Sequence, residues 1–148
     1  MNMTVNIRPA TARDLPCAIE LLRRAELPTE DLAAGHLVLV AEGEAGVLGV
    51  IGLEAFEDVG LLRSLVVSPP ARSEGVGRAL VDALESLARE RGIAELWLLT
   101  IDADAFFATS GFSVRGRDDA PSAVRASQEF SSLCPDNAVL MSKTAGRV

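Results

Sequence analysis

The hydrophobic positions of this chain recur with two different periods, and the alternation between them predicts a mixed α/β fold. Apolar residues three and four apart predict a helix after Thr11, a good N-cap with Asp14 as its acidic partner. The same spacing predicts a second helix over 75–91, and Gly92 is a normal stop for it. The continuously apolar run 95–100 then predicts a buried, central strand.

Shorter segments complete the predicted order of elements. The sequence predicts strands at 5–8, 36–42, 47–55, 59–68, 112–115 and 138–143, and further helical segments at 30–34, 102–110 and 122–130. Glycines at both ends of 43–46 indicate a hairpin between the second and third strands. One β-α-β crossover among antiparallel hairpins predicts a mixed sheet with helices on both faces.

Composition narrows the class of protein. The 148 residues, 49% of them hydrophobic, suit one domain over 1–148, without repeats or linker-like runs. The net charge of −7 argues against a nucleic-acid partner. No apolar run approaches the roughly 20 residues that span a bilayer and no signal-peptide pattern opens the chain, so a cytoplasmic protein without membrane contact is expected. Cys17, Cys134 and His36 do not form a metal-ligand set, so no metal is expected.

The most informative segment is 65–80, which predicts a strand, a proline-broken turn and the start of a helix. Within it Arg72 is followed by Gly75 and Gly77. Glycines at a helix start let backbone N–H groups approach a ligand closely, and the helix dipole favours an anion there. The segment therefore predicts a phosphate site; the alternative is a tight turn that packs the helix on the sheet. A Walker A loop is excluded because no Gly-Lys-Ser/Thr follows.

These residues resemble the GCN5-related N-acetyltransferase (GNAT) superfamily, and the resemblance covers nearly the whole chain. Arg72, Gly75 and Gly77 match its pyrophosphate motif Q/R-x-x-G-x-G/A, with V-V-S-P before it and F-F-x-x-x-G-F after it. The resemblance implies the GNAT fold, with a mixed, mostly antiparallel central sheet flanked by helices on both faces. It also implies acetyl-CoA as the acetyl donor and a small-molecule amine as the acceptor. The implied acetyl-CoA residues are Leu65, Val66, Val67, Arg72, Ser73, Glu74, Gly75, Val76, Gly77, Arg78 and Phe106.

The general acid departs from the family pattern. Many members carry a tyrosine in F-Y-x-x-x-G-F that protonates the departing thiolate, and Phe107 occupies that position in a chain without any tyrosine. A coenzyme A thiolate can leave without full protonation, so activity is still expected. Cys134 is an alternative proton donor, because a thiol has a pKa near 8.5; its other interpretation is a buried, inert thiol.

The general base is also open. Some relatives carry a glutamate where this chain has Leu61. Glu54 or Glu57, at the end of the preceding strand, could deprotonate the amine directly or through water. A solvated hairpin end explains either glutamate equally simply.

Two arginines are candidates for the acceptor site. Strand alternation places Leu61, Arg63, Leu65 and Val67 on one face, which borders the acceptor cleft in the family. Arg63 in this apolar strand needs an anion, either a substrate carboxylate or Glu54. Arg125 could form the acceptor wall or could pair with Glu129 one turn away.

A finer resemblance concerns the C-terminal segment 124–141. It looks like the acetyltransferases of bacterial arsenic-resistance operons, which implies an amino-acid-like acceptor, including arsenic- and phosphorus-containing glutamate mimics. Direct attack in a ternary complex is expected, because no activated nucleophile pair is present. The alternatives are a catalytically silent acyl-CoA-binding module and a peptide or protein N-acetyltransferase. A homodimer through the C-terminal strands is also expected from the family.

Overall fold

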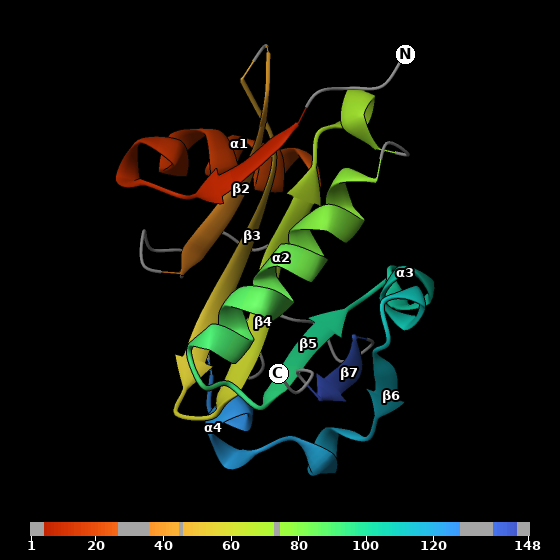
Figure 1. The fold of residues 1–148 in the computed structure, drawn as a ribbon. Coiled ribbons are helices and arrows are strands. Elements are labelled where there is room, and N and C mark those ends of the chain that lie inside the picture. Colours follow the sequence, from red (N-terminus) through yellow and green to blue (C-terminus); the bar gives the residue numbers. More distant parts are fainter. Residues whose placement is uncertain (1–4, 27–35, 45, 73–74, 128–137, 145–148) are drawn as a thin grey trace. The chain divides into compact units, whose positions relative to one another are not determined.

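The computed structural model describes residues 5–26, 36–44, 46–72, 75–127 and 138–144. Its helices are α1 (Leu15–Arg24), α2 (Val76–Glu90), α3 (Asp104–Thr109) and α4 (Ser122–Arg125), with 3-10 helices η1 (Ala12–Asp14), η2 (Pro69–Ala71) and η3 (Arg117–Asp119). Its strands are β1 (Asn6–Pro9), β2 (Leu37–Gly43), β3 (Gly46–Phe56), β4 (Val59–Val67), β5 (Glu95–Thr100), β6 (Ser113–Arg115) and β7 (Val139–Thr144) (Figure 1).

The strands form one mixed sheet in the order β1-β2-β3-β4-β5-β7-β6. β2 is antiparallel to β1 and β3, and β7 is antiparallel to β5 and β6. β4 runs parallel to β5, and α2 is the helical crossover that such a parallel pair needs. The mixed, mostly antiparallel α/β fold flanked by helices is therefore confirmed.

The described residues belong to two compact units. The first unit lies within Met1–Leu53 and Ser64–Leu84, and the second within Glu54–Arg63 and Glu85–Val148. β3, β4 and α2 each contribute residues to both units. The single-domain organisation over 1–148 stays a prediction.

In the first unit, α1 packs on one face of the sheet. Its buried residues join strand residues in one apolar cluster, formed by Ala18, Leu21, Leu22, Leu37, Val40, Val50 and Val66. The helical members of this cluster lie three and four residues apart or adjacent, which is the spacing of one helix face. The helix predicted after Thr11 is therefore confirmed, although its first turn is the 3-10 helix η1.

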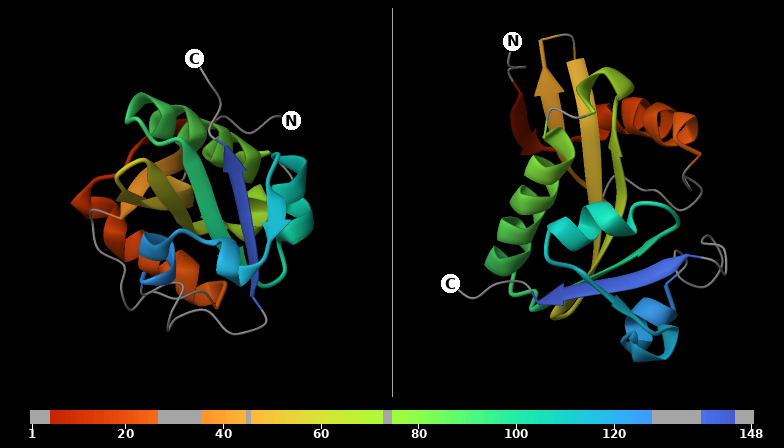
Figure 2. Two further views of the ribbon diagram at one scale, coloured as in Figure 1. Left: turned by 90° about the horizontal axis from the view of Figure 1, so that it is seen from below. Right: turned by 90° about the vertical axis from the view of Figure 1, so that its right-hand side faces the viewer.

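The absence of a side chain at Gly49 lets α2 lie close to the other face of the sheet in the first unit. A Cβ atom at this position would lie 3.1 Å from Leu80 Cδ1 and 3.1 Å from the carbonyl oxygen of Val66. Because strand side chains alternate between faces, Gly49 and the neighbouring Val50 face opposite sides. The first half of α2 thus covers the face opposite α1, as the right-hand view of Figure 2 shows.

An ion-pair network ties β1, η1 and β2 together. Arg8 donates to both carboxylate oxygens of Asp14, at 3.0 and 2.9 Å, and to Glu42 at 3.3 Å. The backbone N–H of Thr11 donates to Asp14 Oδ2 at 2.7 Å, which confirms the predicted role of Asp14 at the helix start. These hydrogen bonds, above all those from Arg8, lower the pKa of the buried Asp14 to about 2.

In the second unit, α4 and η3 adjoin the sheet face that carries Trp97. Leu61, Trp97 and Leu140 form a buried cluster with Ala120 and Val124. Trp97 is adjacent to Leu61 across the β4–β5 pair and to Ser142 across the β5–β7 pair. The predicted buried strand 95–100 is therefore confirmed with its ends unchanged.

On the opposite face of the second unit, Lys143 connects β7 to α2 and to the end of α3. Its ammonium group donates to Glu85 Oε2 at the end of α2 and to the carbonyl oxygen of Ser110 after α3, both at 2.7 Å. Gly111 follows with a φ of +95°, and a Cβ there would lie 3.2 Å from the lysine side chain. The backbone conformation therefore favours glycine at this position of the F-F-x-x-x-G-F segment, and a side chain would also have to displace the end of Lys143 slightly.

Several predicted ends are displaced by one residue, and two predicted helices differ from the structure by more. The helix predicted over 102–110 begins at Asp104, because Thr100 Oγ1 accepts the N–H of Ala103 before it. The stretch predicted over 122–130 is helical at Ser122–Arg125; from residue 128 it lies outside the described residues, as does the predicted turn at 30–34.

Candidate active site

The loop after β4 is built to present backbone N–H groups at the start of α2. β4 ends at Val67, η2 turns the chain, and α2 begins at Val76. Gly75 has a φ of +80°, and no atom lies within 4 Å of a Cβ placed there, so its backbone conformation alone calls for glycine. The first N–H groups of a helix have no intrahelical acceptor. With the dipole of a helix of 15 residues, Val76, Gly77 and Arg78 therefore offer an anion site.

Arg72 borders this loop and is held in place by the end of β4. Its Nε donates to the carbonyl oxygen of Val67 at 2.9 Å, and the residue is exposed. The guanidinium is therefore anchored on one side and can offer its terminal nitrogens to a phosphate. Ser73 and Glu74, which the resemblance also assigns to this loop, lie outside the described residues.

Ser64 interrupts β4 with a left-handed backbone, with a φ of 60°. A residue of this conformation inside a strand marks an irregularity that changes which face the next side chains occupy. In the first unit Val66 joins the α1 cluster, whereas Val67 lies 3.4 Å from a Cβ placed at Gly49 on the α2 side. Val66 and Val67 therefore face opposite sides of the sheet. The predicted placement of Arg63 on the face of Leu65 and Val67 stays a prediction. Serine gives no signal of this conformation in the sequence.

Arg63 is buried in the second unit and pairs with Glu54. Its Nη1 donates to Glu54 Oε1 at 2.7 Å, and the two side chains are 0% and 13% exposed. Of the two partners considered from sequence, Glu54 is therefore the one in contact. Glu57, the other candidate base, lies exposed in the β3–β4 turn with a φ of 59°.

Phe106 and Phe107 lie on α3 in an aromatic cluster. The ring of Phe107 meets those of Phe106 and Phe112 edge to face, with centroids 5.1 and 5.7 Å apart. Phe107 and Phe112 are buried, and Phe106 is half-buried. The position that carries a tyrosine in many family members is therefore filled by a packed ring without a hydroxyl group.

The remaining candidates are divided between α4 and the part of the chain that is not described. Arg125 is exposed at the end of α4, one residue after Val124, which is fully buried. Its proposed partner Glu129 and the candidate acid Cys134 lie outside the described residues. No group of three His, Cys, Asp or Glu side chains among the described residues could hold a metal ion. None of the described helices is long and apolar enough to cross a membrane.

The arrangement of these elements and the glycine loop is that of the acetyltransferases. Residues 6–112 match the model of the Acetyltransferase (GNAT) family. Because this match covers more than half of the chain, the protein belongs to the GNAT family, as its sequence motifs indicated.

Its particular relatives include amino-acid acetyltransferases. The chain is 28% identical over 127 residues to the amino-acid acetyltransferase of Neisseria meningitidis serogroup A, covering 79% of this chain and 29% of that protein. The structure of N-acetylglutamate synthase from Neisseria gonorrhoeae complexed with coenzyme A and N-acetyl-glutamate matches with a TM-score of 0.85 at 25% identity, covering 99% of this chain and 36% of that chain. The chain thus spans about a third of the length of these relatives.

A relative of similar length shares the fold. A Mycobacterium tuberculosis protein whose structure was solved in complex with CoA matches with a TM-score of 0.79 at 24% identity. That match covers 94% of this chain and 98% of the other. The GNAT fold is therefore also found in a protein of about this size.

Proposed function

We propose that this protein binds acetyl-CoA and transfers its acetyl group to the primary amine of a small, amino-acid-like acceptor. The observation that carries the proposal is the start of α2, where Gly75, Gly77 and Arg72 form a donor set suited to a pyrophosphate. Membership of the GNAT family and the CoA complexes of the similar structures support acetyl-CoA as the donor.

Within this proposal each part of the site has a separate task. Bound acetyl-CoA would supply a thioester that an amine attacks directly, so that coenzyme A leaves as a thiolate. The amides of residues 73–78 and Arg72 would hold the pyrophosphate, and Leu65, Val66, Val67 and Phe106 would contact the rest of the donor. Glu54 is proposed to accept the proton of the amine through water. Alignment of the two reactants would supply much of the acceleration.

The acceptor class rests on the relatives and on two arginines. The similar proteins include an amino-acid acetyltransferase and an N-acetylglutamate synthase. Both names indicate an amino-acid substrate. We propose that the exposed Arg125 contacts the acceptor carboxylate, and that Arg63 contributes to the same site while it is paired with Glu54. A narrower proposal, acetylation of arsenic- or phosphorus-containing glutamate mimics, rests on segment 124–141, most of which lies outside the described residues.

A charge reversal tests the donor site. Arg72→Glu should abolish acetyl-CoA binding, measured by calorimetry, and should leave the thermal unfolding transition in place, because the residue is exposed. Arg89→Glu on the same helix, where Arg89 bonds only Ser86 among the described residues, is the matched control and should bind normally. Normal acetyl-CoA binding by Arg72→Glu would contradict the proposed donor site.

A second candidate function is a catalytically silent acyl-CoA-binding module. The buried Phe107 ring favours it, because no hydroxyl group is available there for proton transfer. A thiol-release assay with free amino acids, glutamate analogues and polyamines separates the two functions. Turnover with carboxylate-bearing amines, weakened by Arg125→Gln, supports the transferase; tight binding without turnover on any amine supports the module.

Two proposals on partners complete this assignment. We propose that the protein has no nucleic-acid partner, because its net charge is −7. We also propose a homodimer, from the family resemblance; light scattering of the purified protein measures its mass directly.

A further inference from the structure

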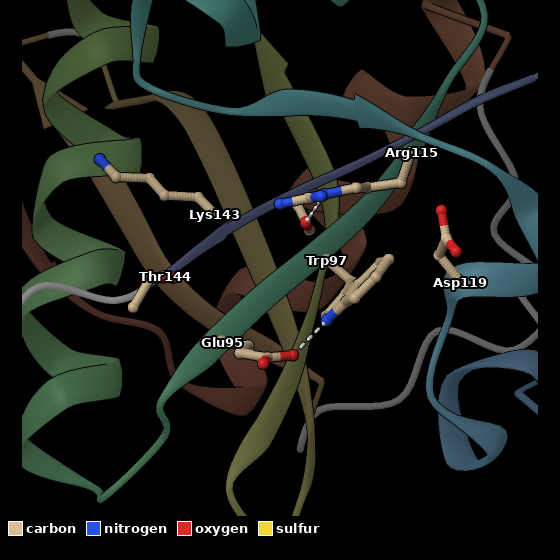
Figure 3. Close-up of a pocket in the computed structure, with 7 residues that line it drawn as sticks. Glu95, Trp97, Arg115, Asp119, Lys143 and Thr144 are labelled. Atoms are coloured by element: carbon tan, nitrogen blue, oxygen red, sulfur yellow. Dashed lines mark hydrogen bonds between the residues drawn. The ribbon is translucent and has the colours of Figure 1, made fainter.

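A pocket in the second unit is lined by charged groups of both signs. It has a volume of about 310 Å³ and lies between β5, β7, the end of β6 and η3 (Figure 3). Its lining includes Glu95, Trp97, Arg115, Asp119, Ser142 and Thr144. None of these residues belongs to the donor or acceptor sites proposed above.

Arg115, Glu95 and Asp119 are each held by one hydrogen bond from or to a neighbouring group. Arg115 Nε donates to Ser142 Oγ at 2.9 Å, and the indole N–H of Trp97 donates to Glu95 Oε1 at 3.0 Å. The backbone N–H of Gly116 donates to Asp119 Oδ2 at 3.1 Å. These bonds leave the two terminal nitrogens of Arg115 and one oxygen of each carboxylate for a ligand.

The guanidinium of Arg115 and the carboxylates of Glu95 and Asp119 line one pocket but do not form ion pairs with each other. Among the described residues, no ion pair within 4.0 Å joins Arg115 to Glu95 or to Asp119. Figure 3 shows Glu95 and Asp119 on opposite sides of the Trp97 ring, with Arg115 extended across β7. A molecule with a carboxylate and an ammonium group can complement such a separated set, each group facing the opposite charge.

We propose that this pocket binds a small zwitterion, such as a free α-amino acid. The terminal nitrogens of Arg115 would bind its carboxylate. One of the two carboxylates, Glu95 or Asp119, would bind its α-ammonium group, and the other is left for a second cationic group. Lys143 does not add a positive charge to the pocket, because its side chain points away toward α2 and its ammonium is engaged by Glu85 and Ser110. Two carboxylates therefore face one guanidinium, which favours an amino acid with a second cationic group over an acidic one.

The chain carries its own reporter for this pocket. Trp97 is the single tryptophan and there is no tyrosine, so intrinsic emission and the indole N–H signal both report on the pocket lining. Titration of the whole protein with L-lysine should give a saturable change in both signals. Nα-acetyl-lysine lacks the α-ammonium group and lysinamide lacks the carboxylate, so each should bind at least about tenfold more weakly; L-glutamate should also bind more weakly.

Variants locate the binding. Arg115→Gln and Asp119→Asn should each weaken lysine binding at least about tenfold, whereas Arg91→Gln, an exposed arginine after α2, should not. Arg125→Gln, in the proposed acceptor site, should also leave the response intact. The proposal is overturned if no saturable change occurs up to about 10 mM lysine, or if Arg115→Gln binds normally. It is overturned as well if Arg125→Gln abolishes the response, because the signal would then report on acceptor binding.

Discussion

Arg63 donates a hydrogen bond of 2.7 Å to the carboxylate of Glu54, and both side chains are largely excluded from solvent. The pair joins the end of β3 to β4 on the two sides of one hairpin. Burying two charges costs dehydration that their attraction only roughly repays, and removal of one partner takes this attraction away from the other. An anion that reaches Arg63 must therefore compete with Glu54.

The first prediction concerns this pair. Arg63→Met and Glu54→Leu should each lower the free energy of unfolding by about 3–5 kcal/mol, because each removes one charge of a buried ion pair. The double variant should be within about 2 kcal/mol of the original protein, since it removes both charges. Urea unfolding of all four proteins measures the coupling. Additive losses in the double variant would show that the pair is not the main partner of either residue.

The Lys143–Glu85 pair should be worth more than an exposed pair of the same type. The side chains of Lys143 and Glu85 are 23% and 13% exposed, whereas those of Arg24 and Glu20, four residues apart on α1, are 69% and 56% exposed. A double-mutant cycle by urea unfolding should give a coupling of about 1–3 kcal/mol for the first pair, and about 0.3–0.5 kcal/mol for the second. Equal couplings would contradict the role of Lys143 in tying β7 to α2.

The free energy of unfolding should fall at low pH because Asp14 becomes protonated. Its pKa is lowered from 3.8 to about 2 in the folded protein, chiefly by hydrogen bonds from Arg8. A lowered carboxyl pKa stabilises the folded state fully above the unfolded value, and this contribution is lost as pH falls from about 4 to 2. The loss should reach up to about 2 kcal/mol.

The matched variant for this effect is Asp14→Asn. It should be less stable at neutral pH and should lose less stability between pH 4 and 2, because residue 14 no longer takes up a proton. Guanidinium unfolding across that range measures both proteins. An identical acid profile for the two would contradict the lowered pKa of Asp14.

Gly49 should not tolerate a side chain. In Gly49→Ala the new Cβ would meet the Val66 carbonyl oxygen and Leu80 Cδ1, both at 3.1 Å, and the backbone oxygen cannot move aside. We expect a loss of about 1–3 kcal/mol in the free energy of unfolding. Gly116→Ala is the control: its Cβ would lie 3.4 Å from Asp119 Oδ2 at a φ of −72°, so its effect should stay within about 0.5 kcal/mol. Similar losses for both variants would contradict the close approach of α2.

The sequence predicted elements best where one period of apolar residues continues unbroken. The strand at 95–100 has its predicted ends, and the helix predicted over 75–91 forms at Val76–Glu90. The backbone irregularity at Ser64 could not be predicted, because serine is not selective for a positive φ.

The sequence predicted the acetyl-CoA loop of the candidate site in more detail than the acceptor side around Arg63. The glycine loop carries its chemistry in consecutive residues, so its motif was readable before the fold was known. The sequence offered Glu54 and a substrate carboxylate as partners of Arg63, and the choice between them required the fold, because Glu54 is nine residues away on another strand. The pocket of Arg115, Glu95 and Asp119 joins residues from β5, β6 and η3, which no local pattern relates.

The hydrogen bond from Arg72 to the carbonyl oxygen of Val67 has an entropic consequence. A long side chain that a ligand must immobilise costs about 0.5–1.5 kcal/mol of binding free energy. Arg72 is already restrained by the strand end before any anion arrives, so part of that ordering cost falls on folding instead of on binding. The last carbonyl of β4 thereby makes Arg72 a more ordered anion ligand than its exposed position suggests.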